Sequence, residues 1–159
     1  ITRQLAIAIE NDHMLKEMGF DNARDCLGYR VVVKNVERLG DHAVRLSQDV
    51  LDYKTPIQGK NFDRIQEMSS YAISVMDDAC LALFKKDYDQ AEKSIESANN
   101  IQKYEKRILD NLKTSKDEEE IFRIRKIVEN VKRVAEYASD IGEIVLNMNI
   151  EKILKKPKM

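Results

Sequence analysis

The chain has 159 residues, and its 27 basic residues nearly cancel its 28 acidic ones, leaving a formal charge of −1. A charge this close to zero excludes a protein that is drawn to nucleic acid or to an anionic membrane by its overall field, so a partner must be recognised locally. Only 5 Gly and 2 Pro are present, too few for the many turns of a sandwich or barrel. The composition predicts an all-α fold in one compact unit, with two small domains as the alternative.

The sequence also argues against membrane insertion and export. Its longest apolar runs, such as residues 79–84, are only a few residues long, whereas a bilayer span needs about 20, and no signal-peptide pattern opens the chain. Cys26 and Cys80 each lie alone in a helical pattern without a CxxC pair, which disfavours a zinc site or a disulfide framework. We therefore expect free thiols in a reducing cytoplasm.

Apolar residues recur at three- and four-residue steps along most of the chain, the spacing of amphipathic helices. Gly19 and Pro56 are stop signals between such segments. Short connections between long helices favour an elongated antiparallel bundle. Five helices are predicted, near residues 2–17, 22–54, 60–86, 88–113 and 117–153.

Three of these helices are preceded by side chains that are suited to capping. Asp21 can cap the second helix. Asp87, with Gln90 three residues later, resembles a capping arrangement at the fourth helix, and Ser115 with Glu118 forms an S-x-x-E box at the fifth. These residues predict where the helices begin.

An internal repeat becomes visible when the two longest helices are aligned. Glu37-x-x-x-Asp41 and Glu136-x-x-x-Asp140 coincide at an offset of 99 residues, and Lys34 then coincides with Arg133. A period of about 100 residues fits a three-helix unit that is used twice.

The repeat predicts the organisation of the chain. Residues 1–54 form a partial first unit, residues 60–154 a second unit, and residues 155–159 a basic tail. We read the tail as a solvated helix end, with a nucleic-acid contact as the alternative. Because the chain opens in a helical pattern without Met and the first unit lacks its opening helix, we expect it to be a piece of a longer protein.

The two E-x-x-x-D pairs are the candidate site residues. Four residues apart on a helix places both carboxylates on one face, where they repel unless a cation lies nearby. Beside Glu37 and Asp41 lie Lys34, Arg38 and Arg45, so a salt-bridged surface explains this pair as well as a metal does.

The second pair has a different setting. Lys132 and Arg133 lie on the preceding turn, but Glu143 follows Asp140 by three residues, so that Glu136, Asp140 and Glu143 form an acidic ridge. Clustered carboxylates without Cys are hard oxygen ligands, suited to Mg²⁺, Mn²⁺, Ca²⁺ or iron. Because no cation lies at the i+4 position, we expect the second ridge to bind a hard cation more tightly than the first pair.

The segment Asn35-Val36-Glu37-Arg38-Leu39-Gly40-Asp41-His42-Ala43 resembles the PhoU signature L-E-R-I-G-D-H-A. The segment 133–143 is similar to its second-repeat counterpart, particularly in archaeal-type relatives. This resemblance implies two tandem three-helix bundles that modulate phosphate uptake through a phosphate-specific transporter and its sensor kinase. It also implies a homodimer and a divalent metal, such as iron, zinc or magnesium, on carboxylates. The implied ligands are Glu37, Asp41, Glu136 and Asp140.

The sequence offers little support for an enzyme. No activated Ser or Cys and no phosphate-binding G-x-x-x-x-G-K-S loop is present. A di-iron enzyme needs two Glu-x-x-His motifs; Glu10 and His13 form one, but Leu39 precedes His42 where the second needs its Glu. His42 has a role near a metal or is a surface histidine. The remaining alternatives are a metal-free helical scaffold and the dimerisation part of a larger DNA-binding regulator, since an AbrB-type domain can precede the PhoU part in such relatives.

Overall fold

The computed structural model describes residues 7, 9, 11–20, 22–53 and 56–154, and these residues contain helices and no strands. The predicted all-α class is therefore confirmed. The predicted tail at 155–159 lies outside the described residues. The helices are α2 (Asp12–Glu17), α3 (Ala23–Asp52), α4 (Gly59–Lys85), α5 (Tyr88–Asn99), α6 (Ile101–Leu112) and α7 (Glu118–Leu154).

The prediction of one continuous helix over residues 2–17 is wrong, because the helix does not continue through Asn11. This residue is extended, with φ −142° and ψ 108°, and its side chain accepts hydrogen bonds from the backbone N–H groups of His13 and Met14. An asparagine side chain that caps in this way begins a new helix, because it supplies an acceptor to donors that lack an intrahelical partner. Residues 1–6, 8 and 10 lie outside the described part of the chain.

The fourth predicted helix, 88–113, is divided at Asn100. The backbone N–H of Asn100 donates to the carbonyl of Ser97 at 3.0 Å, a three-residue step. The Asn100 side chain donates to the carbonyl of Glu96 at 3.3 Å. Because the Asn side chain competes for a helical acceptor, one straight helix becomes α5 and α6.

The capping predictions had mixed outcomes. The backbone N–H of Gln90 donates to Asp87 Oδ1 at 3.1 Å, which confirms Asp87 as the cap of α5. At α7 the cap is Asp117, whose Oδ1 accepts from the N–H of Glu120 at 2.9 Å. Ser115, the predicted cap, instead accepts from the Asp117 N–H at 3.3 Å in the preceding turn.

The cap of α3 is Asn22, whose Oδ1 accepts from the N–H of Asp25 at 3.0 Å. The predicted cap, Asp21, lies outside the described residues. At the end of α4, Lys86 takes the left-handed conformation with φ 52°, which ends the helix within one residue of the predicted end at residue 86.

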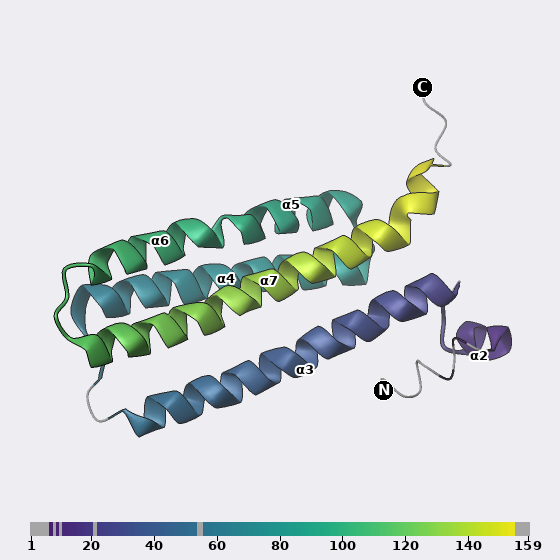
Figure 1. Ribbon diagram of the computed structural model, residues 1–159. Coiled ribbons are helices and arrows are strands. Elements are labelled where there is room, and N and C mark those ends of the chain that lie inside the picture. Colours follow the sequence, from purple (N-terminus) through teal and green to yellow (C-terminus); the bar gives the residue numbers. More distant parts are fainter. Residues whose placement is uncertain (1–6, 8, 10, 21, 54–55, 155–159) are drawn as a thin grey trace.

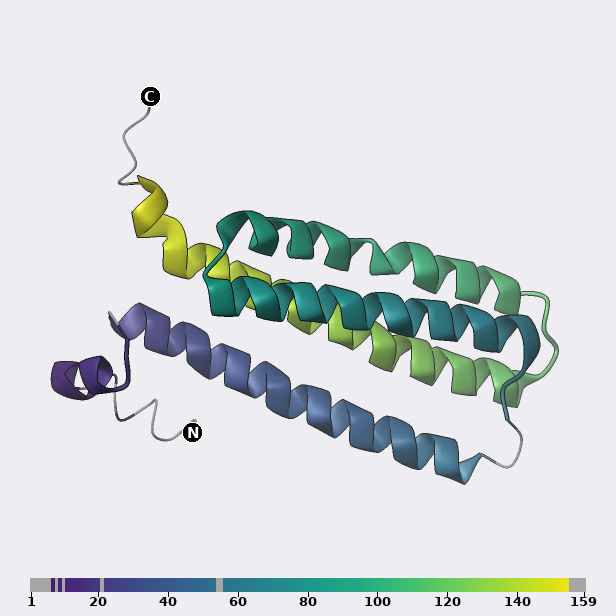
Figure 2. The ribbon, with the colours of Figure 1, turned by 180° about the vertical axis from the view of Figure 1, so that it is seen from behind.

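Helices α4, α5, α6 and α7 form an elongated bundle, and α3 lies along α7 on its outer side (Figures 1 and 2). Helix α4 is antiparallel to the α5–α6 arm, since Arg64 contacts the carbonyl of Arg107 at 2.9 Å and Tyr71 contacts that of Ser97 at 2.9 Å. Figure 2 shows that α2 lies apart from the bundle, beside the start of α3.

The main core lies around α7, where Ile124, Ala135, Ala138 and Ile141 are fully buried. Gly142 allows α7 to approach α5, because a Cβ there would lie 3.0 Å from Ser94 Oγ and 3.1 Å from the Ala91 carbonyl.

Helix α3 contributes less to this core. Of its apolar residues, only Val32 is among the buried members of the main cluster. Cys26 packs with Leu15 of α2 in a second, smaller cluster. None of the described helices is both long and apolar enough to cross a membrane.

Candidate functional site

The first carboxylate pair lies on the outward side of α3. Lys34 Nζ is 2.8 Å from Glu37 Oε2, and the hydrogen bond and charge of this lysine hold the pKa of Glu37 below its usual value. Asn35 contacts α7, and Glu37 is about 200° further round the helix. Glu37 therefore points away from the bundle, and Asp41, one turn later, is exposed.

The second pair lies on the exposed side of α7, between α3 and α6. Arg133 Nη1 is 2.7 Å from Glu136 Oε2. Asp140 has a partner on another helix, since Asn35 Nδ2 donates to Asp140 Oδ2 at 3.1 Å. Glu143 is exposed. The ridge thus holds one ion-paired carboxylate, Glu136, and two exposed carboxylates, of which Asp140 is hydrogen-bonded by α3.

The structure does not bring the two pairs together. Within the described part of the chain, no group of three or more His, Cys, Asp or Glu side chains is placed to hold a metal ion. A cation on the α7 ridge would therefore have to recruit side chains that now point elsewhere, and it would have to displace Arg133 from Glu136. The residues still offer the oxygen donors that hard cations prefer.

His42 is part of the contact between α3 and α7. Its Nδ1 lies 2.7 Å from Asn130 Oδ1, and its Nε2 lies 3.3 Å from the Tyr137 hydroxyl. Asn130 Nδ2 donates to the Lys126 carbonyl at 2.8 Å, so Asn130 Oδ1 is the acceptor and His42 Nδ1 carries the proton. His42 is thus occupied in joining two helices.

A charged cleft of about 290 Å³ lies between α6 and α7 and includes Glu136. Lys132 Nζ is 2.9 Å from Glu105 Oε2 across this cleft, and Arg133 also approaches Glu129 at 3.9 Å. Basic and acidic side chains therefore alternate along it, and neither sign dominates. The charged residues lining it are Glu105, Arg125, Glu129, Lys132, Arg133 and Glu136.

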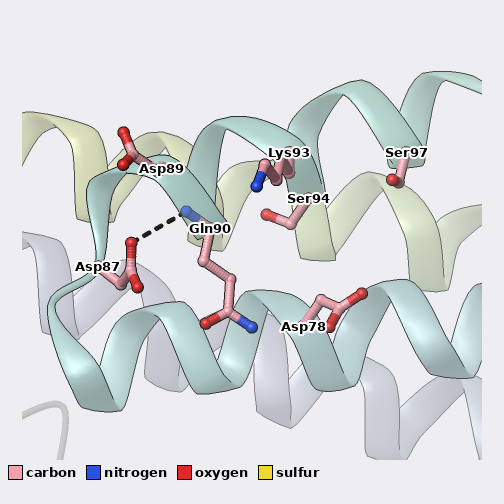
Figure 3. A pocket seen from close by; sticks show the side chains of 7 residues that line it. All are labelled: Asp78, Asp87, Asp89, Gln90, Lys93, Ser94 and Ser97. Atoms are coloured by element: carbon pink, nitrogen blue, oxygen red, sulfur yellow. Dashed lines mark hydrogen bonds between the residues drawn. The ribbon is translucent and has the colours of Figure 1, made fainter.

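A polar cleft of about 460 Å³ lies between α4 and α5, and sequence reasoning missed it. Figure 3 shows Gln90 reaching from α5 toward α4, with Asp78 on the facing side. Several of its polar groups are used locally, because Asp87 caps α5 and Ser94 donates to the Ala91 carbonyl at 2.7 Å. It is lined by Asp78, Asp87, Asp89, Gln90, Lys93, Ser94 and Ser97.

An apolar cleft of about 430 Å³ lies where the end of α3 meets α4 and α7. Its mouth includes Val50 and Phe62, each at least half exposed. Leu46, Ile65 and Ile127 form part of its wall. Periodicity could have indicated these apolar residues, but the cleft itself depends on how α3 is placed.

Sequence reasoning also missed Asn35, Asn130 and Tyr137 as partners of candidate residues. Asn35 was within the quoted motif, yet a local pattern gives no sign that it meets Asp140, which lies 105 residues away. The one available signal was a polar residue on the apolar face of an amphipathic helix.

Comparison with known proteins identifies the family to which the chain belongs. A family model described as the PhoU domain matches residues 65–145, which is more than half of the chain. The matched segment runs from α4 into α7 and includes Glu136, Asp140 and Glu143. No curated protein and no solved structure matches the chain. The chain therefore belongs to the PhoU family, whose members regulate phosphate transport.

Proposed function

We propose that this protein is a cytoplasmic regulatory module of phosphate uptake that acts by protein contact with phosphate-transporter components and their sensor kinase. The observation that carries the proposal is the PhoU domain match at residues 65–145, which falls on the α4–α7 bundle. A rigid bundle with charged outer faces is suited to recognising a partner by electrostatic complementarity. The clefts described above offer no activated nucleophile, and the proposal requires none.

Phosphate uptake by cells tests the regulatory role. In a bacterial strain that lacks its own PhoU-type regulator but keeps the transporter, expression of this protein should lower uptake of radiolabelled phosphate when external phosphate is plentiful. A strain expressing a variant with charge reversals on the α6–α7 cleft, Arg125→Glu and Lys132→Glu, reports whether that surface contributes. Unchanged uptake with the soluble wild-type protein present would contradict the proposal.

The proposal includes a hard divalent cation on the α7 ridge, bound by Glu136 and Asp140 with help from Glu143. Its support is the set of carboxylate oxygens on one helical face and the exposure of Glu143. The pair Glu37 and Asp41 is a weaker second site in this proposal.

Paired double variants test the metal assignment. Glu136→Gln with Asp140→Asn should abolish most Mn²⁺ binding in calorimetry, whereas Glu37→Gln with Asp41→Asn should abolish little of it. In Mn²⁺ buffer the wild type should gain melting temperature by mass action on the folded state. Equal Mn²⁺-induced shifts of the melting temperature in the wild type and the α7 double variant would show that the ridge is ordinary surface charge and binds no metal.

A homodimer through the outward face of α3 completes the proposal. Val36, Val44 and Leu51 follow one another at helical spacing on this face and are 56%, 57% and 84% exposed. Apolar residues grouped in this way favour association. Leu51→Glu should shift sedimentation from dimer toward monomer, whereas Phe84→Glu, at a position 82% exposed at the end of α4, should not. A wild-type protein that stays monomeric at high concentration would contradict this part.

A further inference from the structure

Helix α3 is held in the molecule mainly by one neighbour. Of the described helices, α7 is the one against which α3 packs extensively, whereas α7 also packs extensively against α4 and α5. Figures 1 and 2 show α3 lying along α7, outside the bundle. A helix with one extensive contact can separate from the molecule while the other helices stay packed together.

The contact between α3 and α7 buries little apolar surface of α3. Val32 is the buried apolar residue that α3 adds to the main core, and its Tyr29 and Leu46 are only partly buried against that core. Because the burial of apolar surface is the dominant favourable term in folding, α3 gains little stability by docking. The second cluster joins Cys26 of α3 to Leu15 of α2, so α2 is attached to α3 and moves with it.

Polar contacts supply much of the remaining attachment. Asn35 donates to Asp140 at 3.1 Å, Lys126 donates to Asp49 at 2.7 Å, and His42 meets two polar side chains of α7 at 2.7 and 3.3 Å. Such contacts contribute little net stability, because hydrogen bonds to water replace them when the helices separate. Docking also leaves Asn35 Oδ1 buried without a hydrogen bond, a cost that solvent removes on separation.

From this arrangement we infer that α3 is a releasable strap, which separates from α7 together with α2 while the bundle of α4, α5, α6 and α7 stays folded. Local opening of this kind is expected where few apolar contacts hold an element. Release uncovers the side of α7 where Asn130 and Tyr137 meet His42 and where Ile144 meets Gly28. The protein then has a closed state, in which α3 covers this side of α7, and an open state, in which the side faces solvent. The inference goes beyond the proposed function and needs no metal.

The closest approach of α3 to α7 provides a way to lock the strap. A Cβ at Gly28 would lie 2.9 Å from Ile144 Cγ2. Gly28→Cys with Ile144→Cys removes that methyl group and brings two cysteine β-carbons within reach of the roughly 3.5–4.5 Å separation of a disulfide. Combined with Cys26→Ala and Cys80→Ala, these changes leave one possible disulfide in the chain. The reduced form of the same variant is the matched control for the oxidised form.

Native-state hydrogen exchange of the full chain measures the release. Amides of α3 should exchange about tenfold or more faster than the buried amides of α4 and α7. Their exchange should also depend less on urea, because release exposes less surface than global unfolding does. Oxidation of the Gly28→Cys, Ile144→Cys variant should slow α3 to the rate of α7, since both ends of the strap are then tied, and reduction should restore the faster exchange.

Two further variants separate release from a general loss of stability. His42→Ala removes contacts that hold the strap, so it should speed exchange in α3 by about fivefold and leave α4 and α5 unchanged. Lys132→Met is the control, because it breaks a 2.9 Å ion pair with Glu105 inside the bundle and should leave exchange in α3 unchanged. A single rate and urea dependence for α3 and α7 would overturn the inference. Fast α3 exchange that persists in the oxidised variant, or an equal acceleration of all helices by His42→Ala, would overturn it as well.

Discussion

Helices α3 and α7 carry the same acidic pattern in very different surroundings. Helix α7 is enclosed by α3, α4 and the α5–α6 arm, whereas α3 lies on the outside of the bundle against α7 (Figure 1). Ion pairing of the glutamates is repeated in both: Lys34 pairs with Glu37 at 2.8 Å, and Arg133 pairs with Glu136 at 2.7 Å. A repeated sequence pattern therefore reproduces its local contacts.

The aspartates of the two helices differ. Both Asp41 and Asp140 are exposed, but only for Asp140 do the described contacts include a hydrogen bond from another helix, which the buried Asn35 donates. From the sequence, we expected the two pairs to differ in the basic residues beside them. In the structure, however, Arg133 pairs with the Glu136 carboxylate just as Lys34 pairs with that of Glu37. What distinguishes the pairs is a contact between helices, which the repeat does not contain.

The largest expected effect is the difference in lost unfolding free energy between a truncation on the buried face of α7 and one on the exposed face of α3. Ile141→Ala removes a fully buried side chain, and such truncations cost about 2–5 kcal/mol of unfolding free energy through lost burial and the cavity left behind. Val36→Ala, at a position 56% exposed, should change stability by no more than about 0.5 kcal/mol. Urea unfolding followed by circular dichroism measures both, and similar costs would mean that α3 is as enclosed as α7.

Two glycines offer the next comparison. Gly142→Ala places a Cβ 2.7 Å from Ile95 Cγ1 and 3.1 Å from the Ala91 carbonyl, and overpacking of this kind costs about 1–3 kcal/mol. Gly40→Ala meets nothing within 4 Å and should stabilise the protein by up to about 1 kcal/mol through helix propensity. The same unfolding experiment gives both values, and a stabilising Gly142→Ala would contradict the close approach of α5 and α7.

Local chemistry accounts for much of what the sequence predicted correctly about the fold. Sustained 3.6-residue periodicity gave the long helices, and Asp87 was recognised as a cap because its contacts lie within three residues. The break at Asn100 was missed because periodicity continues through it, and only the competition of its side chain for the Glu96 carbonyl reveals it.

The candidate site was less predictable. The sequence identified the carboxylates and their repeat, because residue type and spacing are local properties. It could not identify Asn35 as the partner of Asp140 or Asn130 as the partner of His42, since both contacts require α3 to lie antiparallel to α7 in one register. Clefts likewise depend on the placement of several helices.

The His42 contact tests whether polar groups hold α3 in place. His42→Ala removes the bond to Asn130 Oδ1 at 2.7 Å and the one to Tyr137 at 3.3 Å, and should cost about 1 kcal/mol of unfolding free energy. His13→Ala is the matched control, because its imidazole is 80% exposed beside Glu17 and should cost less than about 0.5 kcal/mol. Equal effects would show that His42 contributes nothing to the attachment of α3.

The smallest expected effect concerns the ion pair between Lys126 and Asp49, which joins α7 to α3 with a separation of 2.7 Å. The hydrogen bond that Lys126 Nζ donates to Asp49 Oδ1 raises the pKa of Lys126 above its ordinary value of 10.5. A raised pKa means that the folded state holds this proton more tightly than the unfolded state does, so the stabilisation is complete below pH 10.5 and is lost as pH rises through the folded-state value. Asp49→Asn removes the cause of the shift. The stability difference between the wild type and Asp49→Asn, measured by urea unfolding, should therefore be constant from neutral pH to about pH 10 and shrink above it. High salt should reduce the difference at neutral pH, because both side chains are partly exposed and their attraction is screened. A difference that is unchanged at alkaline pH would show that Asp49 supports α3 through packing, and that the charge on Lys126 plays no part in holding the two helices together.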